Sequence, residues 1–158
     1  MERDTKQEII RAVEGFFEQK GAKYEPFDER GVARARYGVM SKIKGVSILF
    51  IASDYQLVIQ SMLPVEADEE SRAKVGEFLM RANYGFRMGC FDYDYRDGDI
   101  SFRVSHYCGD EEFIPPTYEQ IDYMLMLSLA MVSKYGDGLL KVLLGVVEPE
   151  DAIKEIES

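Results

Sequence analysis

The chain has 158 residues, of which 46% are hydrophobic and 30% are charged, as expected of one folded domain with a sizeable core. Its formal net charge of −10 argues against DNA, RNA or anionic lipid as the main partner, because each of these requires a basic surface. It contains neither a signal-peptide pattern nor an apolar run near the roughly 20 residues of a membrane helix, so we expect a cytoplasmic protein without membrane contact.

The first part of the chain predicts one helix followed by three strands. Thr5 to Glu8 has the spacing of a capping box, and the apolar residues after it recur at helical spacing, which predicts a helix over residues 5–20. Apolar alternation and a continuous apolar run predict an antiparallel meander of strands over residues 31–39, 46–52 and 55–63. We expect Pro64 to end the third strand, because proline cannot donate to the ladder.

Helices are predicted before and after the next pair of strands. Residues 67–82 have a helical apolar stripe, with three acidic residues in the first turn. Thr117 to Gln120 forms a second capping box before residues 121–135, which are apolar on more than one face and should form the most buried helix. Gly136 and Gly138 are expected to break that helix. Two short helices should follow, over residues 137–144 and from Pro149 onward.

Residues 84–107 predict a β-hairpin, and this is the most strongly determined part of the chain. Asp97-Gly98 is a preferred pair for a two-residue type I′ turn. With the turn there, apolar residues face apolar residues: Tyr95 faces Ile100, Tyr93 faces Phe102 and Phe91 faces Val104. On the other side of the strands, Asp94 faces Ser101 and Asp92 faces Arg103. A slip of one residue would place the aromatic row in water.

Together these elements predict the α+β class, as a single domain over residues 1–158. We expect a two-layer antiparallel sheet with helices on one face, in the order α-β-β-β-α-β-β-α-α. The prediction assumes that the meander and the later hairpin belong to one sheet. In the predicted hairpin Cys90 and Cys108 are not opposed, so both should be reduced thiols.

No pattern in the chain supplies a catalytic residue, a cofactor site or a metal site. The acidic run from Asp92 to Asp99 has the composition of a calcium loop, but Arg96 and Arg103 occupy ligand places of the EF-hand pattern. His106 is the only histidine and has at most one soft partner nearby, which is too few for zinc. We therefore expect a protein that is not an enzyme and that holds no cofactor.

Several short motifs in this chain match a known family. They are Leu63-Pro64, the run from Ala82 to Gly85, the run from Met88 to Phe91, Asp97-Gly98-Asp99, Thr117 before an apolar helix, and the run from Pro149 to Ala152. Over about residues 5–155 the chain resembles the YbjN-like family of small bacterial proteins, which are labelled sensory transduction regulators. The resemblance implies a fold similar to that of type III secretion chaperones, a tendency to bind proteins and no enzyme activity. It supplies no active-site residues.

The preferred hypothesis is a non-enzymatic, chaperone-like regulatory protein that forms a homodimer and binds a partner protein. The partner would lie on an exposed sheet face or add a strand to a sheet edge. Candidate contacts are Tyr93, Tyr95, Phe102 and Tyr107, for each of which core packing is the alternative.

A second hypothesis is a small-molecule or ion-binding regulator, with its pocket between the sheet and the helix over residues 121–135. Met124, Met126 and Met131 of that helix suit either an adaptable partner groove or the filling of the core.

Overall fold

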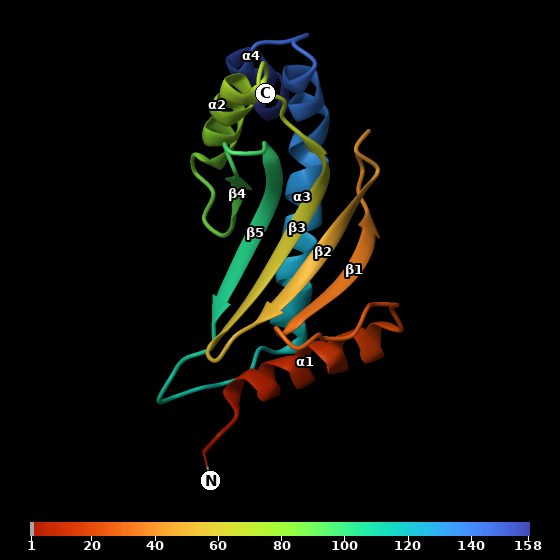
Figure 1. Cartoon of the computed structure of the whole chain (residues 1–158), viewed down its shortest axis with the longest axis vertical. Coiled ribbons are helices and arrows are strands. Elements are labelled where there is room, and N and C mark those ends of the chain that lie inside the picture. Colours follow the sequence, from red (N-terminus) through yellow and green to blue (C-terminus); the bar gives the residue numbers. More distant parts are fainter. Residues whose placement is uncertain (1) are drawn as a thin grey trace.

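The structure is a computed structural model that describes residues 2–158, and its central element is one five-stranded antiparallel sheet (Figure 1). The strands lie in the order β1-β2-β3-β5-β4: β1 Val32–Gly38, β2 Gly45–Ala52, β3 Gln56–Glu66, β5 Asp99–Tyr107 and β4 Cys90–Tyr93. The helices are α1 Thr5–Lys20, α2 Arg72–Asn83, α3 Tyr118–Leu143 and α4 Pro149–Glu157. The pairing of β3 with β5 joins the meander to the hairpin. The predicted fold class and element order are thus confirmed.

The helices lie on one face of this sheet, and the core fills the space between the two layers. Along β2 every second side chain is buried, as the period of a strand requires. Phe50 of this strand packs edge-on against Phe17 of α1, with ring centroids 4.8 Å apart. A hydrogen bond between the buried hydroxyls of Ser61 and Ser128 joins β3 to α3. In Figure 1, α3 runs behind the strands and none of the four helices lies over their near face.

The hairpin forms where the sequence places it, but the predicted register is wrong by two residues. Phe91 pairs with Phe102 and Tyr93 pairs with Ile100. Residues 94–98 form a longer loop, closed by hydrogen bonds between the backbones of Asp94 and Asp99 (3.0 Å) and of Gly98 and Asp94 (2.7 Å). Because side chains on a strand alternate between the two faces of the sheet, a shift of two residues leaves each paired side chain on the face that was predicted for it.

The predicted cap of α1 and the predicted start of α2 require correction. Asp4, not Thr5, caps α1 by accepting a hydrogen bond from the Gln7 N–H (3.0 Å). The acidic residues predicted for the first turn of α2 precede that helix, which begins at Arg72.

Strand β3 does not end at Pro64 but continues to Glu66. Its register with β5 breaks between Met62 and Glu66, which is the kind of irregularity that accommodates a proline. Pro64 therefore lies within the break in the pairing of β3 with β5 and does not end the strand.

Helix α3 is continuous over 26 residues, so Gly136 and Gly138 do not break it. A Cβ at Gly136 would collide with Ser41, and one at Gly138 would collide with Ile156 of α4. These glycines permit close packing inside the helix. Within residues 2–158, no helix has the combined length and apolar character that a membrane crossing requires.

Candidate functional site

The structure brings together two of the four predicted contact residues. Tyr93 and Tyr95 lie beside each other at the end of the hairpin, with ring centroids 4.9 Å apart. Phe102 is 0% exposed in the core, so it is unavailable to a partner and the alternative of core packing holds for it. Tyr107 is 66% exposed, but it lies at the opposite end of β5 from the hairpin loop.

The two tyrosines are held against helix α2. The Tyr93 hydroxyl donates a hydrogen bond to the Arg72 carbonyl oxygen in the first turn of α2 (2.8 Å). Burial raises the pKa of Tyr93 to about 12, so the phenol stays a neutral donor at physiological pH. The Tyr95 hydroxyl lies over Gly76, where any Cβ would collide with it. A glycine inside α2 therefore leaves room for the tyrosine.

A pocket opens between α2 and the hairpin, and we call it the α2 pocket. Its volume is about 530 Å³, and its lining is mainly apolar: Ala73, Gly76, Glu77, Leu79, Met80, Asn83, Phe91, Tyr93 and Tyr95. Met80 is 72% exposed and Tyr95 is 58% exposed, so large apolar groups border the opening. Glu77 is neutralised by an ion pair with Arg81 (3.0 Å). The α2 pocket is thus suited to apolar groups.

Asn83 at the end of α2 covers the outer edge of strand β4. Its side-chain nitrogen donates to the Phe91 carbonyl oxygen (3.0 Å), and its side-chain oxygen accepts from the Phe91 N–H (2.7 Å). The side-chain amide thereby takes the place of a neighbouring strand. An edge closed in this way is a poor template for an added strand.

The opposite edge of the sheet, strand β1, is also covered along part of its length. Glu25 forms an antiparallel bridge with Arg34, through hydrogen bonds of 2.7 Å and 3.1 Å. The Asp28 carboxylate accepts from the Val32 N–H (3.0 Å). Strand addition, which the sequence suggested as one way of binding a partner, therefore has little free edge at either side.

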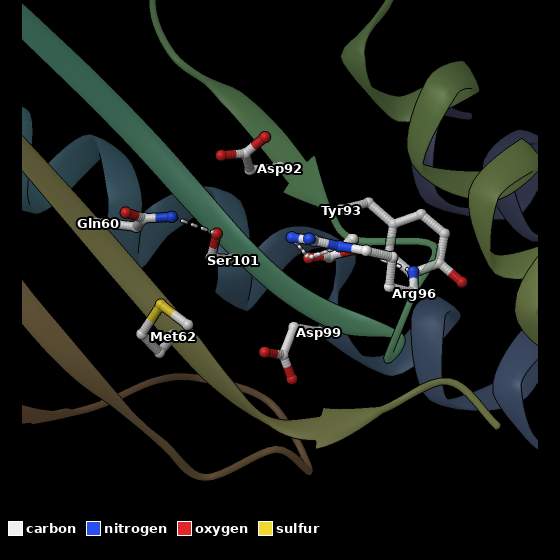
Figure 2. A pocket seen from close by; sticks show the side chains of 8 residues that line it. Gln60, Met62, Asp92, Tyr93, Arg96, Asp99 and Ser101 are labelled. Carbon is white, nitrogen blue, oxygen red and sulfur yellow. Dashed lines mark hydrogen bonds and ion pairs between the residues drawn. The ribbon is translucent and has the colours of Figure 1, made fainter.

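A second, more polar pocket of about 360 Å³ lies on the helix-free face of the sheet beside the hairpin (Figure 2). Tyr93 lines both pockets. Figure 2 shows the carboxylates of Asp92 and Asp99 on this face, with the Arg96 side chain between them. The Gln60 side chain donates to the Ser101 hydroxyl (2.9 Å) across the floor.

The carboxylates of this polar pocket are largely neutralised by arginines. Arg96 is paired with Asp94 (2.8 Å), and its hydrogen bonds hold the pKa of Asp94 at about 2. Arg103 is paired with Asp92 (3.2 Å). Within residues 2–158, no three His, Cys, Asp or Glu side chains gather as a metal site would require. The arrangement can provide binding surfaces, and it presents no activated nucleophile or general base.

Sequence reasoning missed three residues of this site: Gly76, Met80 and Asn83. Gly76 is a glycine inside a helical pattern, which is the signal for close approach by another group. Asn83 directly follows the predicted helix over residues 67–82, where an asparagine indicates a helix end, but its side chain bonds to the backbone of strand β4. Met80 carries no distinguishing signal, because a single exposed apolar residue on a helix is ordinary.

Comparison with known proteins adds a family and a fold. The family model described as "YbjN: Putative bacterial sensory transduction regulator" matches residues 10–141. Among solved structures, the chain is similar to the crystal structure described as "YbjN, a putative transcription regulator from E. coli", with a TM-score of 0.55 and 14% sequence identity. That match covers 86% of this chain and 89% of the other, and at this identity it shows the fold alone. A search of curated proteins gave no match.

Proposed function

The chain belongs to the YbjN family, whose members are described as regulators, and on that premise we propose that it regulates by binding another protein in the α2 pocket. The observation that carries the proposal is the exposure of Met80 and Tyr95 at the border of a mainly apolar pocket. Complete burial of such a side chain stabilises a complex by roughly 1.5–3 kcal/mol. Two neighbouring anchors of this kind are typical of the centre of a protein–protein interface.

The partner would bind through side chains, not through an added strand. Asn83 already occupies the backbone groups of Phe91 on the β4 edge. The α2 pocket, in contrast, is open and has room for one or two bulky apolar side chains. Its walls belong to α2, to the paired strand β4 and to Tyr95 of the hairpin loop, whose hydroxyl already lies against Gly76, so little ordering of the protein is required on binding.

A small-molecule function has less support. It would need a cavity between the sheet and α3, where aromatic side chains instead pack closely. Phe91 lies 5.1 Å from Phe102 and 5.8 Å from Tyr135 by ring centroid, each in edge-to-face geometry. We therefore place the partner at the surface pocket beside α2.

Site-specific photo-crosslinking in cells tests this proposal. A photoreactive phenylalanine analogue is incorporated at Met80 or, as the control, at Met40, an 89% exposed methionine in the β1–β2 turn. We expect one discrete protein adduct from position 80 and none from position 40. Identical adduct patterns from both positions, or no adduct from position 80, would contradict a partner site in the α2 pocket.

A Gly76→Ala substitution provides the matched variant. The new methyl group displaces Tyr95 and changes the pocket, so the adduct from position 80 should disappear. Stability should change by less than about 1 kcal/mol, because alanine favours the helix and the far end of the Tyr95 side chain, a residue 58% exposed, can move. An unchanged adduct in this variant would show that the partner does not use the pocket.

A further inference from the structure

A pocket of about 460 Å³ lies at the β1 edge of the sheet, the edge opposite the hairpin, and we call it the β1 pocket (Figure 1). Three of its lining residues carry a positive charge and one carries a negative charge, in a chain whose net charge is −10. The β1 pocket therefore has the opposite sign of charge to the chain as a whole. Among its lining residues are Lys23, Tyr24 and Glu25 of the segment after α1, Arg34 and Arg36 of β1, and Ser47 of β2.

The cations of the β1 pocket have no ion-pair partner in the described part of the chain. Within residues 2–158, Lys23, Arg34 and Arg36 take part in no salt bridge, and neither does Glu25. All four residues are exposed. Like charges repel one another, so an anion that contacts the three cations together would relieve their repulsion. The pocket thus has the charge of an anion-binding site.

The segment after α1 is held in place by its own contacts. The Tyr24 ring stacks on Phe17 in the core, with ring centroids 4.1 Å apart. Glu25 forms an antiparallel bridge with Arg34, through backbone hydrogen bonds of 2.7 Å and 3.1 Å. Because side chains alternate along an extended chain, Lys23 and Glu25 lie on the side opposite Tyr24. The charges of the segment are therefore positioned by a fixed backbone.

The backbone N–H of Arg36 adds a further donor at this edge. The Arg34 N–H bonds outward to the Glu25 carbonyl oxygen (3.1 Å), so by alternation the Arg36 N–H points to the same edge. No hydrogen bond within residues 2–158 reaches this N–H. Ser47 lies opposite Arg36 in the register of β1 and β2, and its hydroxyl can also donate. Neutral donors and cationic side chains therefore line the same pocket.

From this set of donors we propose that the β1 pocket binds the phosphate group of a small molecule. A phosphate ester carries about −1.5 to −2 charges at pH 7 and three acceptor oxygens, which suits three cations, an N–H and a hydroxyl better than a carboxylate does. The planar guanidinium of arginine binds phosphate through paired hydrogen bonds.

The number of cations favours a small ligand over a nucleic acid. A protein that binds DNA or RNA through its backbone makes many phosphate contacts, roughly 6–10 in a typical case, and the β1 pocket offers three cations. The α2 pocket shares no residue with the β1 pocket. The phosphate site is therefore a second binding function, independent of the one proposed for the α2 pocket.

Amide NMR titration of the full-length protein tests the site, with inorganic phosphate, ribose 5-phosphate and ribose as probes. We expect saturable shifts of the Arg36 amide with both phosphates and none with ribose. Tighter binding of ribose 5-phosphate would identify the ligand as an ester, and equal binding would identify it as free phosphate. Binding should strengthen as the pH rises through about 6, where phosphate loses its second proton. No saturable shift, or shifts confined to residues outside the β1 pocket, would overturn the proposal.

Charge-removing variants supply a second test, each with a control of equal charge change. Arg36→Gln should raise the dissociation constant for phosphate about tenfold, whereas Arg11→Gln, at an exposed arginine of α1, should leave it unchanged. Glu25→Gln removes a carboxylate from the pocket and should lower the constant about threefold, whereas Glu111→Gln, in an exposed loop, should not. Equal constants for either variant and its control would refute a phosphate site in the β1 pocket.

Discussion

The hydrogen bonds of Asn83 provide a sharp test of how the hairpin is fixed to α2. The Asn83 side chain both donates to and accepts from the backbone of Phe91, in a half-buried setting. Asn83→Ala leaves the Phe91 N–H and carbonyl without these partners. Within residues 2–158, these two bonds are the only side-chain hydrogen bonds to the backbone of β4, a strand of four residues. The substitution therefore leaves the outer edge of this strand uncovered.

The size of the effect follows from the two bonds. Each contributes roughly 0.5–1.5 kcal/mol net, so together they are worth about 1–3 kcal/mol. Alanine is the better helix former by up to about 0.7 kcal/mol, which offsets part of the loss at the end of α2. We expect Asn83→Ala to lower the free energy of unfolding by about 1–2 kcal/mol. For a chain of this length that corresponds to a fall in Tm of roughly 2–8 °C.

Urea denaturation and calorimetry measure this loss, with Met80→Ala on the same helix as the control. Met80 is 72% exposed, so its truncation should change stability by less than about 0.5 kcal/mol. Asn83→Asp tests the two bonds separately. The new carboxylate can still accept a hydrogen bond from the Phe91 N–H, but it cannot donate to the Phe91 carbonyl oxygen and repels it instead. That repulsion raises the folded-state pKa of the new carboxyl, so the variant should recover stability as the pH falls through it. An Asn83→Ala variant as stable as the control would refute the reasoning.

Two further predictions concern the hairpin loop. Gly98 and Gly85 both have positive φ (80° and 90°), but a Cβ at Gly98 would collide with the Ala67 backbone, whereas one at Gly85 meets nothing within 4 Å. Gly85→Ala should therefore cost about 1–2 kcal/mol in urea denaturation, and Gly98→Ala about 1–3 kcal/mol more; equal losses would contradict the packing argument. Arg96→Gln should raise the pKa of Asp94 above its value of about 2, as measured by carboxyl NMR titration. Because the folded-state pKa is lowered, the Asp94 contribution to stability is present above about pH 4 and is lost as the pH falls toward about 2, and the variant should lose part of this dependence.

The hairpin shows what local sequence determines and what it leaves open. The apolar alternation determined which residues point inward, and Phe91 and Phe102 are buried as that pattern requires. The loop length depended on a distant contact, because Gly98 packs directly on the backbone of Ala67 and its N–H bonds to Asp94. The preference of Asp97-Gly98 for a two-residue turn could not reveal that contact. The resulting error was two residues, an even number, so Phe91, Phe102 and Ile100 stay buried as predicted. Tyr95, however, lies in the loop and is 58% exposed, and Ser101, predicted to face outward, is buried.

The glycines of α3 show the same limit of local rules. Two glycines in three positions predict a helix end, since each costs about 1 kcal/mol relative to alanine. The helix nevertheless continues through Gly136 and Gly138, which lie against Ser41 and Ile156, residues that are far from them in the sequence. Tertiary packing over these positions outweighs the local preference. Only the packed structure distinguishes a glycine that ends a helix from one that admits a neighbour.

The candidate sites were only partly predictable for a related reason. The apolar faces of α3 were expected to be buried together, but the sheet and the other helices leave part of this surface uncovered: Met124 is 1% exposed, whereas Met126 is 52% exposed. A helix with more apolar surface than the sheet and the neighbouring helices can cover leaves the excess in water or buries it against another molecule. Exposing that excess costs free energy in proportion to its area, roughly 25 cal/mol per Å². The apolar pattern of α3 therefore predicted a buried helix, but it could not show which part of the helix the rest of the fold leaves uncovered.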